Sequence, residues 1–240
     1  MRKIARDFCR LVIGPEVIEE SRNALIIQDL SDPSELSPEK CLRRMHLIVR
    51  AMLEDAILCL KSSAAPLAHD VTMRDQDVDR LYWMVSKQHQ RLHSLPGGAA
   101  NGASAQAVSN HRLVAKLLER IGDHAARIAG TFPTLAEKKV LDQKLIKDLE
   151  EANHSAVSIL DKAFNALITG DIDLANEAID SLSHHQKLID ALAHRAATRK
   201  GEELLALGTV VDSIGRTANY AADIAETAID MAVLVEPAAG

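Results

Sequence analysis

The chain has 240 residues and a formal net charge of -6 at pH 7, and 47% of its residues are hydrophobic although only 2% are aromatic. This length accommodates one large or two small domains, and an apolar content supplied by Ala, Leu and Ile favours helices packed on helices over a sheet sandwich. The sequence contains no basic domain of the kind that binds nucleic acids, and none of its apolar runs approaches the roughly 18 residues of a membrane span. The N-terminus carries no apolar signal core, so we expect a cytoplasmic protein.

Residues 1–36 predict a short N-terminal α/β arm. A helix over residues 1–12 ends at Gly14-Pro15, and two short strands follow at 16–21 and 23–28. One helix and two strands bury too little surface to form a domain alone. We therefore interpret residues 1–36 either as a fragment, the remnant of a longer N-terminal region, or as an arm that packs on something else.

Residues 37–235 are predicted to be helical throughout. Ser37-Pro38 places a capping residue before a proline at the first helical position, which is typical of a helix start. Gly and Pro punctuation then separates six helices, at about 37–62, 66–93, 105–130, 135–169, 171–199 and 201–235. The three cysteines, which are Cys9, Cys41 and Cys59, lie in apolar helical segments, and we expect buried, reduced thiols.

The six helices divide into two similar sets of three. Val78-Asp79 in the second helix parallels Ile189-Asp190 in the fifth, and Ile128-Ala129 in the third parallels Ile224-Ala225 in the sixth. The sequence therefore predicts an all-α fold: a tandem pair of three-helix bundles preceded by the arm. The boundaries are 1–36 for the arm, 37–132 for the first repeat and 133–235 for the second.

The first repeat carries two pairs of carboxylates with helical spacing. Asp75 and Asp79 are four residues apart on one helix, and Glu119 and Asp123 are four residues apart on the next. Gly122 has no side chain that would shield the carboxylates of Glu119 and Asp123 from each other. If the helices are neighbours, four like charges converge and raise one another's pKa values unless a cation neutralises them. Hard divalent cations or iron suit such oxygen ligands. The alternative is that each pair is a solvated helix face.

The second repeat departs from this pattern. Gln186 stands where the first repeat has Asp75, and Gly215 and Asn219 stand where it has Glu119 and Asp123. One turn later, a shifted and weaker metal site is predicted from His and carboxylate ligands, which are Asp190, His194, Asn219 and Asp223. Ordinary polar surface is the alternative for these four residues.

Other chemistry has less support in the sequence. A di-iron oxidase needs two Glu-x-x-His motifs, and Glu151-x-x-His154 has no second match. His89 and His93 share a helix face but lack the glutamate of a zinc protease, and the adjacent His184-His185 pair is interpreted as surface. No phosphate-binding Gly loop or nucleophile motif is present, so we predict that the chain is not an enzyme.

Three segments resemble motifs of the PhoU family of phosphate-uptake regulators. They are Glu119-Arg120-Ile121-Gly122-Asp123-His124 with Ile128-Ala129, Asp75-x-x-x-Asp79-Arg80-Leu81-Tyr82-Trp83, and Asn219-Tyr220-Ala221-Ala222-Asp223-Ile224-Ala225-Glu226. The resemblance covers about residues 37–235. It implies two three-helix bundles whose acidic motifs hold iron or zinc, with Asp75, Asp79, Glu119 and Asp123 as the matching ligands.

The same resemblance implies a regulator that contacts a phosphate ABC transporter and, in many bacteria, a sensor histidine kinase. The run over residues 28–36 is similar to the lead-in of the archaeal branch, in which an AbrB-type DNA-binding module often precedes it. No such module is found here, so direct DNA binding is not expected. A homodimer is among the assemblies that the sequence allows. The competing interpretations are a helical scaffold or dimerisation module without metal and a metal-dependent enzyme.

Overall fold

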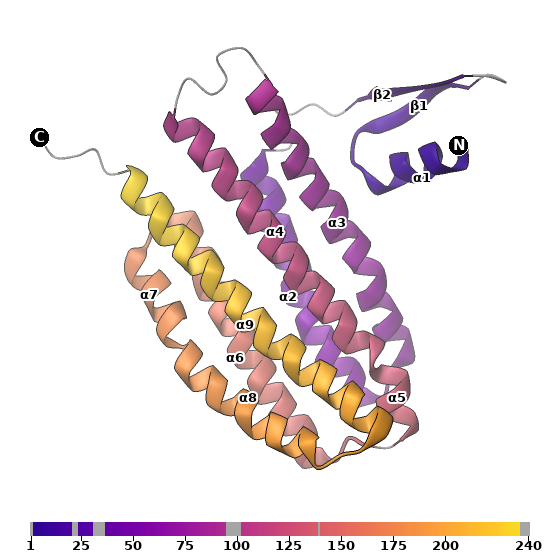
Figure 1. Ribbon diagram of the computed structural model, residues 1–240, viewed down its shortest axis with the longest axis vertical. Helices are drawn as coiled ribbons and strands as arrows, with labels where there is room; N and C mark the ends of the chain where they lie inside the picture. Colours follow the sequence, from indigo (N-terminus) through magenta and orange to yellow (C-terminus); the bar gives the residue numbers. More distant parts are fainter. Residues whose placement is uncertain (1, 21–23, 31–36, 95–101, 139, 236–240) are drawn as a thin grey trace, which may run out of the picture.

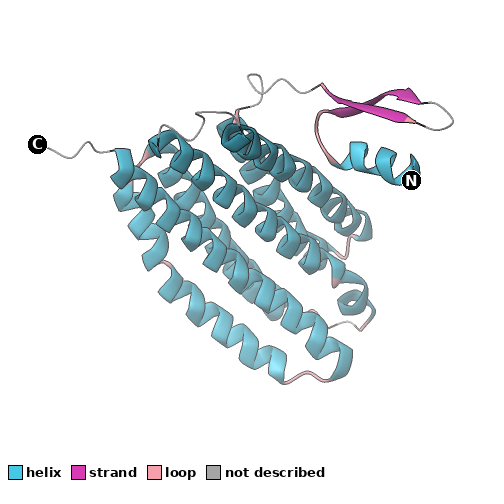
Figure 2. Ribbon diagram, turned by 45° about the horizontal axis from the view of Figure 1, so that its top comes forward, coloured by secondary structure: helices cyan, strands magenta, loops and turns pink. Residues whose placement is uncertain are grey.

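The computed structural model describes residues 2–20, 24–30, 37–94, 102–138 and 140–235. Within these residues it confirms the predicted architecture of two three-helix bundles with a small N-terminal arm (Figure 1). Figure 2 shows the long helices lying roughly side by side, with the single pair of strands set apart at one end.

The arm consists of α1 (Arg2–Leu11), β1 (Pro15–Glu20) and β2 (Leu25–Asp29), and the two strands pair in antiparallel fashion. Polar contacts hold it against the first bundle. Lys87 Nζ donates to the carbonyl oxygen of Ile13 at 3.1 Å, and it also lies 2.8 Å from a carboxylate oxygen of Asp29. Arg91 contacts the other oxygen of Asp29 at 2.7 Å. The arm thus contacts the first bundle through polar groups that centre on Asp29.

The first bundle contains α2 (Pro38–Ser62), α3 (Ala65–Ser94) and α4 (Gly102–Gly130). The Ser37 side chain accepts from the Lys40 backbone N–H at 3.3 Å with Pro38 in the first turn, as the sequence predicts. The predicted loop between the second and third helices falls largely on residues 95–101, outside the described residues. The third helix begins earlier than predicted, at Gly102.

The second repeat contains more helices than the sequence predicts. After a short α5 (Phe132–Glu137) come α6 (Gln143–Thr169), α7 (Ile172–Asp180), α8 (Leu182–Ala197) and α9 (Gly201–Val235). The predicted fourth helix thus starts later, at a cap where Asp142 accepts from the Leu145 N–H at 2.8 Å. The predicted fifth helix is two helices, because the chain breaks at Ser181.

The two bundles share one hydrophobic core. α4 packs along α9 and α2 packs against α6, so buried residues of both repeats form a single cluster. Polar contacts also cross the boundary: Asp161 on α6 accepts from Arg50 Nε at 3.0 Å and lies 2.9 Å from His46 Nε2. The His46 ring stacks on Phe164 with centroids 4.2 Å apart. The two repeats are therefore distinct in the sequence, but they pack around one shared hydrophobic core in the structure.

The cysteines bear out the expectation in part. Cys41 and Cys59 are buried, and their burial raises the pKa of each thiol to about 11, so neither is a reactive thiolate. Cys9 in α1 is only half-buried.

Candidate metal centre

The first acidic cluster is built by α3 and α4, which pack against each other along the first bundle. Val78 and Ile121 are fully buried and mark the inward stripe of each helix. The acidic cluster consists of the side chains that flank these stripes, which are Asp75, Asp79, Glu119 and Asp123. Asp123 is exposed, whereas the other three are half-buried. The helical spacing in the sequence thus predicts correctly which faces the four carboxylates occupy.

The carboxylates act on one another electrostatically. Burial, followed by the negative charges of Asp123, Asp79 and Glu119, raises the pKa of Asp75 to about 6. Burial and the charges of Glu119 and Asp123 also raise the pKa of Asp79, while Lys116 lowers it. The two pairs therefore interact electrostatically, as the sequence predicts for neighbouring helices, and Lys116 compensates part of their negative charge.

Gly122 allows Asp75 to approach α4 closely. A Cβ atom at position 122 would lie 3.3 Å from Asp75 Oδ1, a separation tighter than about nine in ten natural Cβ contacts. The same Oδ1 is buried and makes no hydrogen bond within the described residues. A buried carboxylate oxygen without a donor is costly, and this cost favours a ligand that supplies positive charge.

Lys116 is part of the site, although the sequence analysis missed it. Its Nζ lies 2.5 Å from Glu119 Oε2 and 4.9 Å from the centre of the Tyr82 ring. The spacing of three residues between Lys116 and Glu119 could have revealed this pair. Lys116 therefore supplies a positive charge to an otherwise acidic cluster.

The donor set of the acidic cluster suits a hard cation chemically, because all four candidate ligands are carboxylates. As placed, however, no three His, Cys, Asp or Glu side chains in the described part of the chain surround a point closely enough to ligate one metal ion. Binding would require the carboxylates to turn inward and Glu119 to exchange its contact with Lys116. A metal at this site would supply the positive charge that Asp75 Oδ1 lacks.

The weaker predicted site of the second bundle is spread over two helices. Asp190 and His194 are exposed on α8, where Asp190 accepts from Gln186 Nε2 at 2.8 Å and His194 Nδ1 lies 2.8 Å from the Asp190 carbonyl oxygen. Asn219 and Asp223 are exposed on α9. Desolvation alone raises the pKa of Asp223, with no contribution from Asp190. This second site stays a prediction, without the electrostatic coupling seen in the first.

The remaining histidine motifs have structural explanations. The interpretation of His184-His185 as a surface pair is wrong for His185, which is buried with Nδ1 at 3.2 Å from Ser155 Oγ. Its neighbour His184 is exposed, as is His154. His89 Nε2 lies 3.4 Å from Ser109 Oγ, and the side chain of His93 falls outside the described residues. Adjacent positions on a helix can thus differ completely in burial.

The fold and the acidic cluster define a class: all-helical proteins of two fused three-helix bundles that present clustered carboxylates. Residues 42–131 match the family model described as the PhoU domain. A curated relative from Thermotoga maritima, the "Phosphate-specific transport system accessory protein PhoU homolog 1", is 24% identical over 200 residues, covering 78% of this chain and 82% of the relative.

Two solved structures share the fold. PhoU from Pseudomonas aeruginosa superimposes with a TM-score of 0.74 at 20% identity, covering 81% of this chain and 94% of that one. The phosphate transport system regulatory protein PhoU from Streptococcus pneumoniae gives a TM-score of 0.72 at 19% identity, with coverages of 83% and 96%. The family match lies in the first bundle, and the structural likeness extends over both. Residues 42–131 thus match the PhoU domain, and the chain shares the fold of the PhoU structures.

Proposed function

We propose that this protein regulates phosphate uptake from the cytoplasm by contacting a phosphate ABC transporter or its signalling partner, such as a sensor kinase. The family supports this, because the relatives are named as an accessory protein and a regulatory protein of phosphate transport systems. Among the described residues, no helix has the length and apolar character to cross a membrane. Contact with the transporter would therefore be made through protein surfaces.

We further propose that the acidic cluster binds a metal ion, with iron and zinc as the candidates. One observation carries this proposal: burial, followed by three neighbouring carboxylates, raises the pKa of Asp75 to about 6, while its Oδ1 lacks a hydrogen-bond donor among the described residues. A bound cation would relieve both the repulsion and the missing contact. Among the described residues of the second bundle, the shift at Asp223 has no contribution from a neighbouring carboxylate, so the proposed metal site is on the first bundle.

Metal analysis of protein purified without chelator tests the site. We expect bound transition metal in the wild-type protein and its loss when Glu119→Ala is combined with Asp123→Ala. A matched control is Glu226→Ala with Asp230→Ala, which removes two exposed carboxylates of the same spacing from α9. Metal retained by the Glu119 and Asp123 variant, or lost equally from the control, would show that the acidic cluster is not the site.

Phosphate uptake in cells that lack the gene tests the regulatory role. We expect deletion to leave uptake unrestrained when phosphate is plentiful, and a plasmid copy to restore the restraint. Unchanged uptake under both rich and starved conditions would remove the transport proposal. It would favour the alternative of a helical scaffold or dimerisation module. A metal-dependent enzyme is the least supported alternative.

A further inference from the structure

A polar groove runs between α4 and α9, the antiparallel helices that join the two bundles (Figure 1). The groove is open to solvent and has a volume of about 520 Å³. We call it the basic groove, because four cationic side chains and only two acids line it. The cations are Lys116, Arg120, Arg127 and Arg216, and the acids are Asp123 and Asp212.

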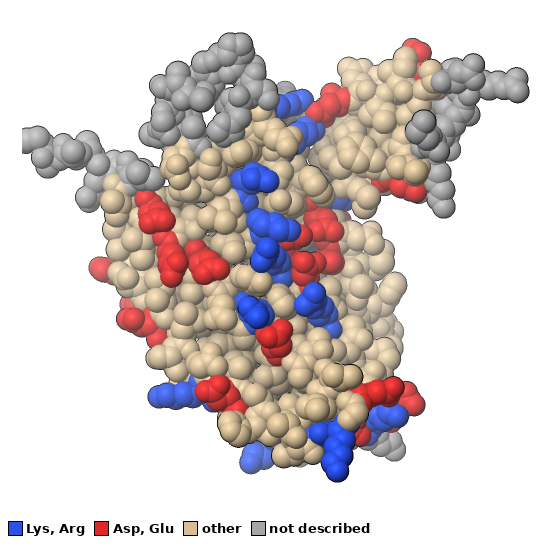
Figure 3. Space-filling model, in the orientation of Figure 1, with Lys and Arg blue, Asp and Glu red and all other residues tan. Residues whose placement is uncertain are grey.

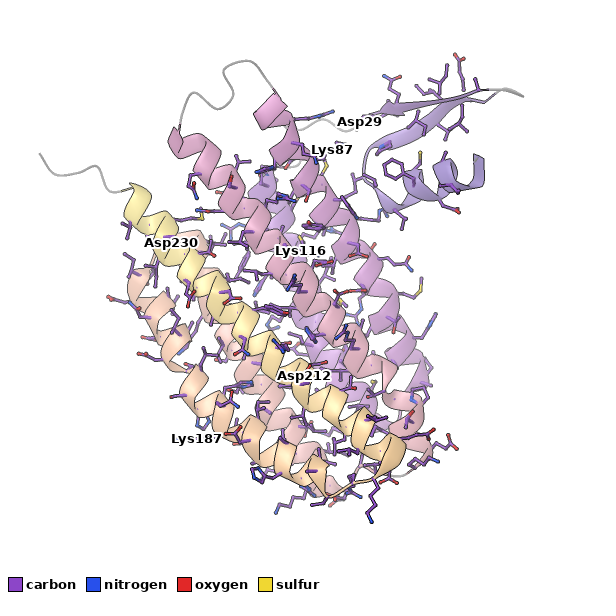
Figure 4. The ribbon with its side chains drawn as sticks, viewed as in Figure 1. Asp29, Lys87, Lys116, Lys187, Asp212 and Asp230 are labelled. Carbon is purple, nitrogen blue, oxygen red and sulfur yellow. The ribbon has the colours of Figure 1, made fainter. Side chains whose placement is uncertain are left out.

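The surface view shows the same concentration of charge. In Figure 3, basic side chains gather over the middle of this face, where α4 and α9 lie side by side, although the whole chain is acidic with a net charge of -6. Figure 4 places Lys116 on α4 and Asp212 on α9 on this same face. The groove is therefore a local reversal of the overall charge.

The arginines of the basic groove are only partly neutralised. Arg216 Nε lies 3.6 Å from Asp212, a loose pair in which both side chains are more than half exposed. Arg120 and Arg127 form no ion pair with a described residue. Arg120 instead reaches across the groove to α9, where its guanidinium lies over the Tyr220 ring at 5.7 Å and its Nη1 is 3.5 Å from the Tyr220 hydroxyl.

These contacts position guanidinium groups for an anionic partner. Stacking on an aromatic ring restrains Arg120 without satisfying its N–H donors, and a guanidinium presents a fork that matches a carboxylate. Aligning Ile128 with Ile224 also pairs Arg120 with Arg216, so each repeat contributes the equivalent arginine to the basic groove. The two bundles together build this surface, and neither presents it alone.

The length of the basic groove indicates the kind of ligand. Lys116 and Arg127 are eleven residues apart on α4, which corresponds to roughly 16 Å at 1.5 Å per residue. An extended chain covers that distance in about five residues, at some 3.3 Å each. A single tetrahedral oxyanion would occupy only part of such a strip.

We propose that the basic groove binds an extended, acidic segment of a partner protein through its Asp and Glu side chains. This inference rests on the proposed function in one respect, because it supplies the surface for the protein contact proposed above. Charge complementarity sets the specificity, and the arginines from both repeats fix the segment across the joint between the bundles. The partner is thus recognised by a carboxylate-rich sequence.

The test measures fluorescence anisotropy with the full chain and a fluorescein-labelled peptide of alternating Glu and Asp, against a Lys peptide of equal length. We expect saturable binding of the acidic peptide that weakens about tenfold when Arg120→Glu is combined with Arg216→Glu. The control is Arg43→Glu with Lys187→Glu, which makes the same charge change at exposed positions outside the groove. Because all four positions are polar and lie on the surface, circular dichroism should show unchanged helicity.

Equal loss in the control, or no loss in the groove variant, would overturn the proposal, since binding would then follow net charge alone or another surface. Two competitors test other occupants. Inorganic phosphate that displaces the peptide at stoichiometric concentration would indicate a small-oxyanion site, and an oligothymidylate that binds tighter than the peptide would indicate a nucleic-acid site. Either result overturns the proposal.

Complementation of the deletion strain separates this inference from the proposed function. If the wild-type gene restrains uptake and the groove variant does so equally well, the regulatory function stands and the basic groove is not its docking surface. If the wild-type gene has no effect on uptake but the peptide still binds in the groove, the regulatory function fails and the acidic-segment site stands.

Discussion

Neutralising Asp75 should stabilise the metal-free protein. Burial and three neighbouring carboxylates raise its pKa from 3.8 to about 6, so the ionised carboxylate destabilises the folded state at neutral pH. A difference of this size corresponds to roughly 3 kcal/mol, which solvent screening of a half-buried group reduces to about 1.5 kcal/mol. We expect Asp75→Asn to raise the free energy of unfolding by about that amount at pH 7.5.

The pH dependence of this effect has a definite sign. A carboxyl whose pKa is raised on folding binds its proton more tightly in the native state, so protonation stabilises the fold below pH 3.8. That advantage is lost as the pH rises through about 6. The difference between Asp75→Asn and the wild-type protein should therefore be largest above pH 7 and shrink towards pH 4.

Urea denaturation in the presence of a chelator, at pH 7.5 and pH 4.5, measures both effects. Asp77→Asn is the matched control, because Asp77 is exposed on the same helix and should change stability by less than about 0.5 kcal/mol at either pH. A destabilised Asp75→Asn protein, or a gain independent of pH, would refute the argument that repulsion in the acidic cluster strains the metal-free fold. Saturating metal should reverse the ranking, since only the wild-type protein keeps the full ligand set.

Three further predictions concern the scaffold. Gly208→Ala should stabilise the protein by about 0.5–1 kcal/mol in thermal denaturation, because a Cβ there meets nothing within 4 Å inside α9, and a lower melting temperature would contradict this. Asp161→Asn should cost about 1–2 kcal/mol at pH 7, since Asp161 accepts from His46 and Arg50. Burial raises the pKa of Asp161, but the contacts with His46 and Arg50 lower it below its usual value. Urea titrations should therefore show that the cost of Asp161→Asn vanishes as the pH falls below 3.8, and a cost that persists in acid would argue against a charge effect. Asp171→Ala should cost about 1 kcal/mol by removing the 3.0 Å cap on the Leu174 N–H, and hydrogen exchange should quicken in α7 before it does elsewhere.

The sequence is informative about the fold because its helix signals are local. Ser37 and Pro38 mark a start that depends only on neighbouring backbone groups, and Gly170 marks an end through its left-handed conformation at φ 70°. The break at Ser181 has no such signal, since its hydroxyl donates to the Glu177 carbonyl as it would inside a continuous helix. We attribute the division of α7 from α8 to their packing against α6 and α9, which no local pattern encodes.

The same distinction applies to the candidate sites. The faces of Asp75 and Glu119 follow from helical spacing, and their proximity follows once two adjacent helices are assumed to pack. The basic groove could not be predicted in this way, because Arg120 contacts Tyr220, which lies a hundred residues further along the chain in the other repeat. The burial of His185 likewise depends on Ser155 from a different helix. Contacts between the bundles are therefore where sequence patterns lose their predictive power.

Lys116 lies between the two charged surfaces and connects them physically. Its ammonium contacts Glu119 in the acidic cluster, and the same side chain lines the basic groove. While Lys116 is paired with Glu119, its positive charge is shared between the acidic cluster and the basic groove. A cation bound by the carboxylates would replace Lys116 as the partner of Glu119 and leave the ammonium available to an acidic segment. Occupancy of the acidic cluster and affinity of the basic groove would then rise together, because thermodynamic linkage makes such a coupling reciprocal.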